Sequence, residues 1–341
     1  MFRVYANIDM HLPLAEIAAA ARRAEAIGFD CVSIPDVCHD GLVAAAIAIG
    51  ATERIQVANS ALVCFPRSPM TTAVAVWDLQ AYSSGRYRLG LGPLVAPNII
   101  QKYSTPWYPP APRMREYVRS MQAIFRCWQY GEKLDFRGKY YQFTRQQVFT
   151  APPPIAHPDI PLHLAAIGPH MTALAGELAD GISTHPTNTS PRYIREVMLA
   201  NIERGARLTG RSRSDIEIIV NPMVATGTSD EAVQHQRARH RATLAILFST
   251  PNYWPSLDLF GWNGLGERLR QMVREGRWSE TASLFSDEMA DIFVPAARYD
   301  ELADILREQY GGLADAIGMG LPSDSADDGA LARVVERLHG A

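Results

Sequence analysis

Short apolar runs alternate with amphipathic helical patterns from the first residues onward, and this alternation restricts the fold more than any other feature of the chain. The run FRVYANID precedes a helical pattern with Pro13 near its start and Gly28 at its end, where helices favour these residues. The alternation continues through DCVSIP, HDGLVAAAIAIGA, RIQVANSALV, SPMTTAVAVWDLQAYSSG and RYRLGLG. This order of elements predicts a parallel sheet with crossover helices.

The alternation pauses in the middle of the chain and then resumes. Residues 93–112 carry six prolines and the aromatic residues Trp107 and Tyr108, which is typical of a lid or binding loop. A helix and a predicted hairpin, DFRGKYYQF, follow. The later strand candidates are LHLAAI, GIST, IEIIVNPMVAT and DIFVPA, the last being the expected eighth strand.

About eight strands and at least as many helices, with no linker between them, predict a single α/β domain over residues 1–341. We expect a (β/α)8 TIM barrel, with lid or insertion segments at about 93–112, 135–160 and 251–288. A doubly wound open sheet is the alternative fold.

Composition narrows the class of protein. A net charge of −3 provides no basic field for nucleic acid or an anionic membrane surface, and all but three of the 33 cationic residues are arginine, as in GC-rich bacterial genomes. The four cysteines lack zinc spacing and the histidines form no metal motif, so we expect no metal and reduced thiols in a cytoplasmic protein. The longest apolar run is about half the length needed to span a bilayer.

Barrel enzymes carry their functional groups at the carboxyl ends of the strands, and two such ends stand out here. Asp36 and His39 follow the second strand, where a carboxylate and an imidazole could position a substrate or move a proton. Alternatively, Asp40 caps the next helix and His39 merely covers it. Gly168 and Pro169 open a helix directly after a strand, which fits either an anion site or a tight turn.

Several segments together resemble the bacterial luciferase-like monooxygenase superfamily, and most closely its branch of coenzyme F420-dependent, methylenetetrahydromethanopterin-reductase-like oxidoreductases. They occur in the order and spacing of that family and cover most of the first 185 residues. They are AEAIGFD (24–30), residues 51–69, SSGRYRLGLG (83–92), FRGKYYQF (136–143) and GPHMTALAGELADG (168–181).

The resemblance implies a flavin or 5-deazaflavin at the strand ends, behind which a non-prolyl cis peptide falls at Ser60–Ala61. Asp36 or His39 would handle protons, and Trp107 and Tyr108 would cover the substrate pocket. After the fourth strand, where relatives carry a polar stretch, Asn98 is the polar residue left. The implied cofactor-binding residues are Asn59, Ser60, Ala61, Asn98, Gly168, Pro169, His170, Met171 and His185.

Three functions follow from this resemblance. The first is hydride transfer between F420 and a small organic substrate, with the cofactor supplying the chemistry. The second is an FMN-dependent monooxygenase on the same barrel, and the third is a cofactor-free binding protein or pseudo-enzyme. By analogy with the family we expect a homodimer or larger homo-oligomer.

Overall fold

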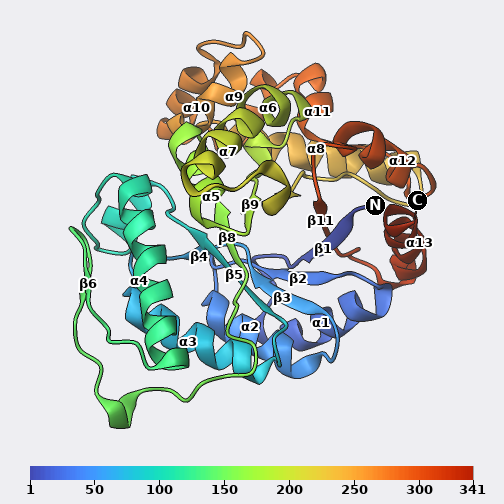
Figure 1. Ribbon diagram of the computed structural model, residues 1–341. Helices are drawn as coiled ribbons and strands as arrows, with labels where there is room; N and C mark the ends of the chain where they lie inside the picture. Colours follow the sequence, from blue (N-terminus) through green and yellow to red (C-terminus); the bar gives the residue numbers. More distant parts are fainter. Residues whose placement is uncertain (341) are drawn as a thin grey trace.

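Parallel strands close into a barrel in the computed structural model, which describes residues 1–340 (Figure 1). The strand order is β3-β2-β1-β11-β10-β9-β8-β5, and β3 also pairs with β5, so the sheet has no open edge. The doubly wound alternative is therefore wrong. The barrel strands are β1 (Arg3–Asn7), β2 (Cys31–Ile34), β3 (Gln56–Asn59), β5 (Tyr87–Gly92), β8 (Leu162–Ala165), β9 (Gly181–Ser183), β10 (Glu217–Val220) and β11 (Ala316–Gly320).

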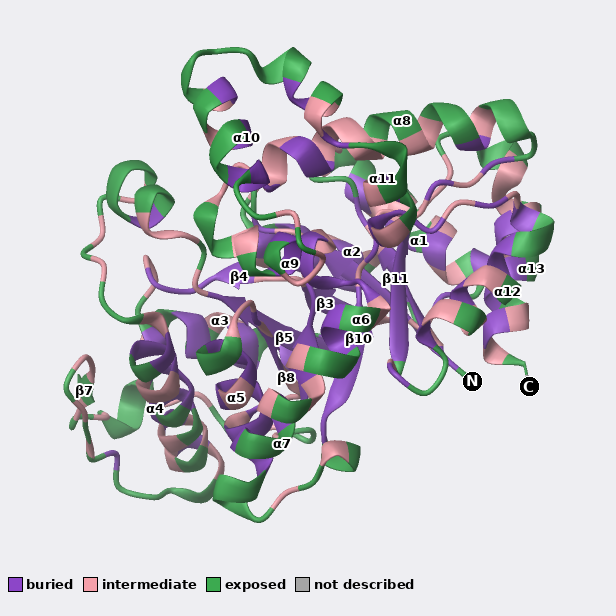
Figure 2. Cartoon of the chain, turned by 90° about the horizontal axis from the view of Figure 1, so that it is seen from above, coloured by how far each residue is buried: buried purple, intermediate pink, exposed green. Residues whose placement is uncertain are grey.

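Helices surround the barrel and cover its strands, which are buried along most of their length (Figure 2). Gly28 ends the first helix in the left-handed conformation, with φ of 101°, as its position in the sequence predicts. The helices outside the later insertion are α1 (Leu14–Ile27), α2 (Gly41–Ala51), α3 (Pro69–Tyr82), α4 (Pro110–Tyr130), α5 (Pro169–Leu178), α6 (Pro191–Tyr193), α7 (Leu199–Ala206), α12 (Tyr299–Tyr310) and α13 (Asp328–His339).

The prediction of an eighth strand at residues 291–296 is wrong. The first half of that run lies in helix α11 (Asp287–Phe293), and the eighth strand is β11, which pairs with β10 and β1. A short apolar run suits a buried helix as well as a strand, and the sequence pattern does not separate the two. Here Phe293 and Val294 are buried in a core outside the barrel.

That second core belongs to an insertion between β10 and α12. Its helices are α8 (Asp230–Leu247), α9 (Trp254–Asp258), α10 (Leu265–Arg274) and α11. Phe248, Phe285 and Phe293 pack against one another at the centre of this core. A bridge between Ala225 and Ala296 closes the base of the insertion, which Figure 1 shows as a compact group of helices at one end of the molecule.

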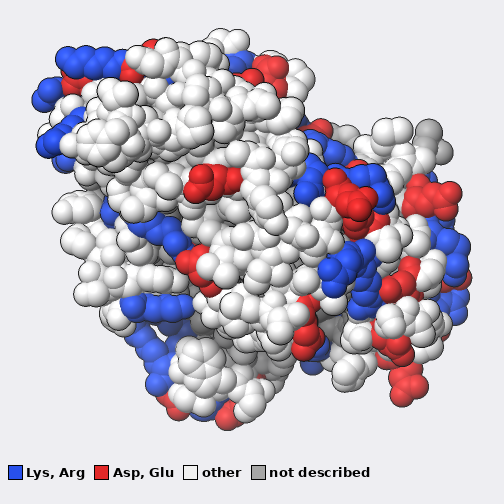
Figure 3. Space-filling view, turned by 90° about the horizontal axis from the view of Figure 1, so that it is seen from below, with Lys and Arg blue, Asp and Glu red and all other residues white. Residues whose placement is uncertain are grey.

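Two further segments lie outside the barrel. The predicted hairpin forms from β6 (Phe136–Arg137) and β7 (Gln142–Phe143) in antiparallel pairing. The Pro-rich segment before α4 contains a π-helix, Asn98–Lys102, and non-glycine residues with positive φ at Leu94 and Ser104. On the face shown in Figure 3, acidic and basic side chains are interspersed.

Candidate functional site

Polar side chains meet at the carboxyl end of the barrel. The Asn221 amide donates to Ser183 Oγ at 2.9 Å, and the Asn7 amide donates to Asn221 Oδ1 at 3.3 Å. Ser60 Oγ lies 3.4 Å from Ser183 Oγ. Asn7, Ser183 and Asn221 were not among the residues chosen from the sequence. Each ends or follows a strand as an inward-facing polar residue, and this could have been the signal for them.

The Ser60–Ala61 peptide bond is cis, which confirms the geometry implied by the family resemblance. It lies between β3 and the short strand β4 (Leu62–Val63), which continues the pairing to β5. The backbone packs so closely here that a Cβ at position 90 would come within 1.9 Å of the Asn59 carbonyl oxygen. A glycine is therefore required at Gly90 for the bulge to fit against β5.

Asn59 itself contributes to the fold beside this bulge. Its side chain is buried, and its amide donates to the Gly41 carbonyl at 2.9 Å while its Oδ1 accepts from the Tyr87 hydroxyl. These bonds hold β3 to the start of α2 and to β5. Both the amide nitrogen and the amide oxygen of Asn59 are thus hydrogen-bonded within the protein.

The polar residues of the loop after β2 have different roles. Asp36 is buried, and its two oxygens accept from the backbone N–H groups of Gly41 at 2.8 Å and Val63 at 2.9 Å. Asp40 caps α2 by accepting from Leu42 N–H at 2.9 Å, which confirms the capping interpretation. His39 is half-buried and makes no hydrogen bond within residues 1–340. Of Asp36, His39 and Asp40, His39 is therefore the residue whose side chain has no hydrogen-bond partner in the described chain.

Gly168 is the residue just before α5, with φ of 78° and ψ of 163°, a conformation that favours glycine. The backbone at this position therefore forms the tight turn that the sequence suggested. No side chain caps this helix, and a Cβ at position 168 would meet nothing within 4 Å. The first N–H groups of a helix lack intrahelical acceptors, and this applies to those of His170 and Met171. His170 is exposed and Met171 is buried.

His185 follows β9 and joins the barrel to the insertion. Its Nδ1 lies 2.8 Å from Thr187 Oγ1, and its ring stacks on Tyr253 with centroids 4.6 Å apart. Burial lowers the pKa of His185 to about 4, so the imidazole is neutral near pH 7. The stack places the segment before α9 over the carboxyl end of β9.

The two aromatic residues of the Pro-rich segment, Trp107 and Tyr108, differ in their packing partners and in their exposure. Trp107 packs edge-on against Phe65 at 6.1 Å, whereas Tyr108 is 45% exposed and pairs with Tyr140 of the hairpin at 5.5 Å. Asn98 is exposed at the start of the π-helix.

Arg113, which was not among the residues chosen from the sequence, holds this segment in place. The buried Arg113 donates to the Phe65 carbonyl at 3.0 Å, the Pro106 carbonyl at 3.1 Å and the Tyr141 hydroxyl at 2.9 Å. The guanidinium has five N–H donors in a fixed plane, so one side chain can hold three separate pieces of chain. Arg113 therefore anchors the Pro-rich segment to the loop after β4 and to the β6–β7 hairpin.

A charged network lies deeper in the barrel. Arg88 donates to Glu217 at 2.5 Å and approaches His163 Nε2 at 2.7 Å, while Tyr5 donates to Glu217 at 3.1 Å. Burial alone would raise the pKa of Glu217, but the hydrogen bond with His163 and the charges of Arg88 and Arg3 lower it to about 2. Burial lowers the pKa of His163. The network therefore holds a charged carboxylate below the polar side chains at the carboxyl end of the barrel, Asn7, Ser60, Ser183 and Asn221, which we call the polar mouth.

The smaller of two cavities reaches this mouth, because Ser60 and Ser183 line it. A chamber of about 10 Å³, sufficient for about one water molecule, lies below the bulge. A far larger groove of about 650 Å³ lies beside Pro161 and Asp180, at the amino ends of β8 and β9. Because ligands of such barrels bind at the carboxyl ends, we place the functional site at the polar mouth rather than in the groove.

A closed parallel barrel with its polar groups at the carboxyl ends of the strands defines the class of (β/α)8 barrels with a ligand site at that end. No group of His, Cys, Asp or Glu within residues 1–340 could hold a metal ion, and no helix there is both long and apolar enough to cross a membrane. Within this class, the chain belongs to the family described as luciferase-like monooxygenase, whose sequence profile matches residues 2–316.

Relatives and solved structures agree with this assignment. An uncharacterised protein of Mycobacterium tuberculosis is 36% identical over 313 residues, covering 91% of this chain and 92% of the relative. A putative coenzyme F420-dependent oxidoreductase of the same organism is 30% identical over 297 residues, covering 81% of each. The F420-dependent tetrahydromethanopterin reductase of Methanopyrus kandleri shares the fold, with a TM-score of 0.82 at 21% identity, covering 99% of this chain and 98% of that one.

Proposed function

We propose that this protein is an F420-dependent oxidoreductase that transfers a hydride to or from a small organic substrate. The observation that carries the proposal is the uncapped amino end of α5, which opens at Gly168 on the same end of the barrel as the cis-peptide bulge. A helix amino end favours an anion such as a phosphate. Relatives named for F420 support this cofactor over others.

The residues present fit the cofactor in two places. The N–H groups of His170 and Met171 would hold its phosphate, and Gly168 would let the phosphate approach the backbone. The bulge at Ser60–Ala61 would lie behind the ring. When bound, F420 would supply or accept the hydride.

His39 is the residue that we assign to proton handling. The Asp36 carboxylate is occupied by backbone N–H groups and Asp40 caps α2, whereas the His39 ring has no hydrogen-bond partner within the described chain. An imidazole can donate or accept a proton near pH 7. Trp107 and Tyr108 would then close the pocket from the Pro-rich segment.

Titration of the purified protein with F420, and separately with FMN, tests the proposal by fluorescence quenching. We expect micromolar or tighter binding of F420 and weak binding of FMN. Selective FMN binding would instead favour a monooxygenase, and binding of neither would favour a cofactor-free protein.

All four cysteines are free thiols, which supports a reducing compartment such as the cytoplasm.

A charge placed at the helix amino end locates the phosphate. His170→Glu adds a carboxylate at an exposed position of the first turn of α5, and we expect it to weaken F420 binding by at least about tenfold. His235→Glu, an equally exposed position on α8, is the matched control and should bind F420 as the wild type does. Equal affinity of both variants would place the phosphate elsewhere.

A further inference from the structure

Exposed apolar side chains follow three strands that lie in one part of the barrel. Met10 comes after β1, Val37 after β2 and Leu94 after β5, and Ile100 lies further along the same segment as Leu94, in the π-helix. These four side chains are 36–51% exposed, and we call them the apolar rim. Segments that follow parallel strands lie at the carboxyl end of a barrel, so the apolar rim shares that end with the polar mouth.

Two contacts bring these segments together. Cys38 Sγ lies 3.4 Å from His11 Nδ1, which joins the segment after β1 to the loop after β2. Lys102 Nζ lies 3.5 Å from the Val37 carbonyl oxygen, which brings the π-helix to the same loop. The residues of the apolar rim therefore come from segments that touch one another. Exposed apolar side chains that gather in one place mark a surface that binds another molecule.

The backbone of Leu94 supports a binding role for this surface. Leu94 has φ of 57°, in the left-handed region. A bulky residue rarely adopts this conformation, which glycine and asparagine accept more readily. Residues in such strained conformations persist where their surroundings hold them, and they cluster at ligand sites. The leucine thus keeps an apolar side chain at this end of the barrel against its own backbone preference.

The charged side chains of these loops offer little to an ionic substrate. Asp36 is buried and bonded to two backbone N–H groups, and Asp40 pairs with Arg67 at 2.9 Å. Asp9 accepts from a backbone N–H at 2.8 Å. Lys102 is the remaining cation, and it forms no ion pair within residues 1–340, where its ammonium group lies beside a backbone carbonyl. An uncharged substrate therefore suits these loops best.

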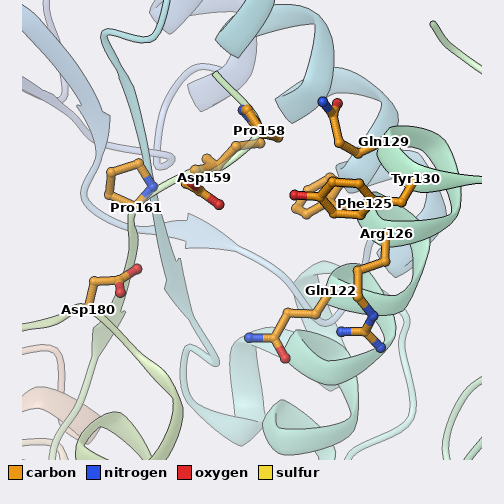
Figure 4. A pocket seen from close by; sticks show the side chains of 10 residues that line it. Gln122, Phe125, Arg126, Gln129, Tyr130, Pro158, Asp159, Pro161 and Asp180 are labelled. Carbon is orange, nitrogen blue, oxygen red and sulfur yellow. The ribbon is translucent and has the colours of Figure 1, made fainter. Parts of the chain in front are cut away.

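The large groove at the amino ends of β8 and β9 is a poorer site for an apolar compound. About half of its lining is polar, and it lies away from the loop that carries His39. The polar and charged side chains around it are Gln122, Arg126, Gln129, Asp159 and Asp180 (Figure 4).

We propose that the apolar rim binds the hydrocarbon part of the substrate, which is therefore an uncharged aliphatic compound. This assignment rests on the proposed function, because His39 marks where the reacting group lies. Val37 is two residues before His39, so a substrate whose reacting group meets the imidazole can extend its hydrocarbon chain over the rim. Removing that chain and the rim from water supplies the affinity.

Calorimetric titration of the full chain, with and without F420, with the primary alcohols butanol, hexanol and octanol tests this proposal. Each added CH₂ group should raise the affinity about two- to fourfold, as burial of a methylene does. The compound ω-hydroxyoctanoate has the chain length of octanol and a terminal carboxylate, and it should bind at least about tenfold more weakly. Affinity that does not depend on chain length would overturn the proposal. Equal or tighter binding of ω-hydroxyoctanoate would also overturn it and would assign anion binding to Lys102.

Two substitutions locate the chain on the rim. Leu94→Asn removes apolar surface while asparagine accepts the left-handed backbone, and Ile100→Ser does so at an exposed position. We expect each to lower the affinity for octanol by at least about fivefold and to leave F420 binding unchanged. Leu208→Ser removes an exposed apolar side chain outside the rim, and this matched control should bind octanol as the wild type does.

The same variants separate the substrate from the cofactor. Wild-type octanol affinity in both rim variants, or loss of F420 affinity in either, would overturn the proposal, the second by assigning the rim to the cofactor. A wild type that binds octanol with the expected dependence on chain length but does not bind F420 would remove the proposed function and leave the apolar rim as a binding site for uncharged aliphatic compounds.

Discussion

The Asp36 carboxylate accepts a hydrogen bond from the backbone N–H of Val63 at 2.9 Å. Asp36 follows β2, whereas Val63 belongs to β4, just beyond the cis peptide. The other Asp36 oxygen accepts from Gly41 N–H at the start of α2. One buried side chain thus ties the loop that carries His39 to the bulge at the barrel mouth, which makes Asp36 a positioning residue.

Asp36→Asn should destabilise the protein, because the amide group replaces an acceptor oxygen and leaves a buried N–H without its bond. We expect the free energy of unfolding to fall by about 1–3 kcal/mol in urea titrations. Asp40→Asn is the control, because asparagine also caps helices well and the position is exposed, so its effect should be small. Equal effects of the two substitutions would contradict the positioning role.

His39→Gln should separate cofactor binding from turnover. If His39 moves a proton, kcat falls by about 10²–10⁴-fold, while the dissociation constant for F420 stays unchanged. Turnover is followed with the substrate that a panel of small alcohols and carbonyl compounds identifies. Loss of F420 affinity with unchanged kcat would instead make His39 a binding residue. His235→Gln on α8 serves as the control for general effects.

Glu217→Gln should weaken the barrel more than any exposed ion-pair substitution. The change leaves the buried Arg88 without its carboxylate, and breaking one side of a buried pair costs about 3–5 kcal/mol. Glu196→Gln disrupts an exposed pair with Arg192 on the molecular surface and should cost about 0.5 kcal/mol or less. Urea unfolding of both variants measures the difference, and similar values would show that the network contributes little.

The lowered pKa of His185 predicts how stability depends on pH. The unfolded imidazole takes up a proton as pH falls below 6.5, whereas the folded one does so only near pH 4. The free energy of unfolding should therefore fall as pH drops from about 6.5 to about 4. His185→Gln should remove that part of the slope, with both proteins compared first at pH 8. An unchanged slope would assign the pH dependence to other groups.

The strand ends that carry the site were largely predictable, because strands and helices alternate along the sequence. The cis peptide at Ser60–Ala61 was implied by family resemblance alone, and Gly90 shows why the bulge fits there. The tasks of Asp36 and Asn59 were not predictable. Both are polar residues near strand ends, yet their side chains bond to backbone groups or residues distant in sequence.

The sequence by itself determined the class of fold, the helix ends at Gly28 and Gly168 and the membership of a family, because local periodicity and local motifs carry that information. Tertiary structure decided which apolar run became the eighth strand, because β11 and α11 differ in what packs against them rather than in their own pattern. It also decided that Arg88, His163 and Glu217 meet inside the barrel, because closure brings together strands far apart in sequence.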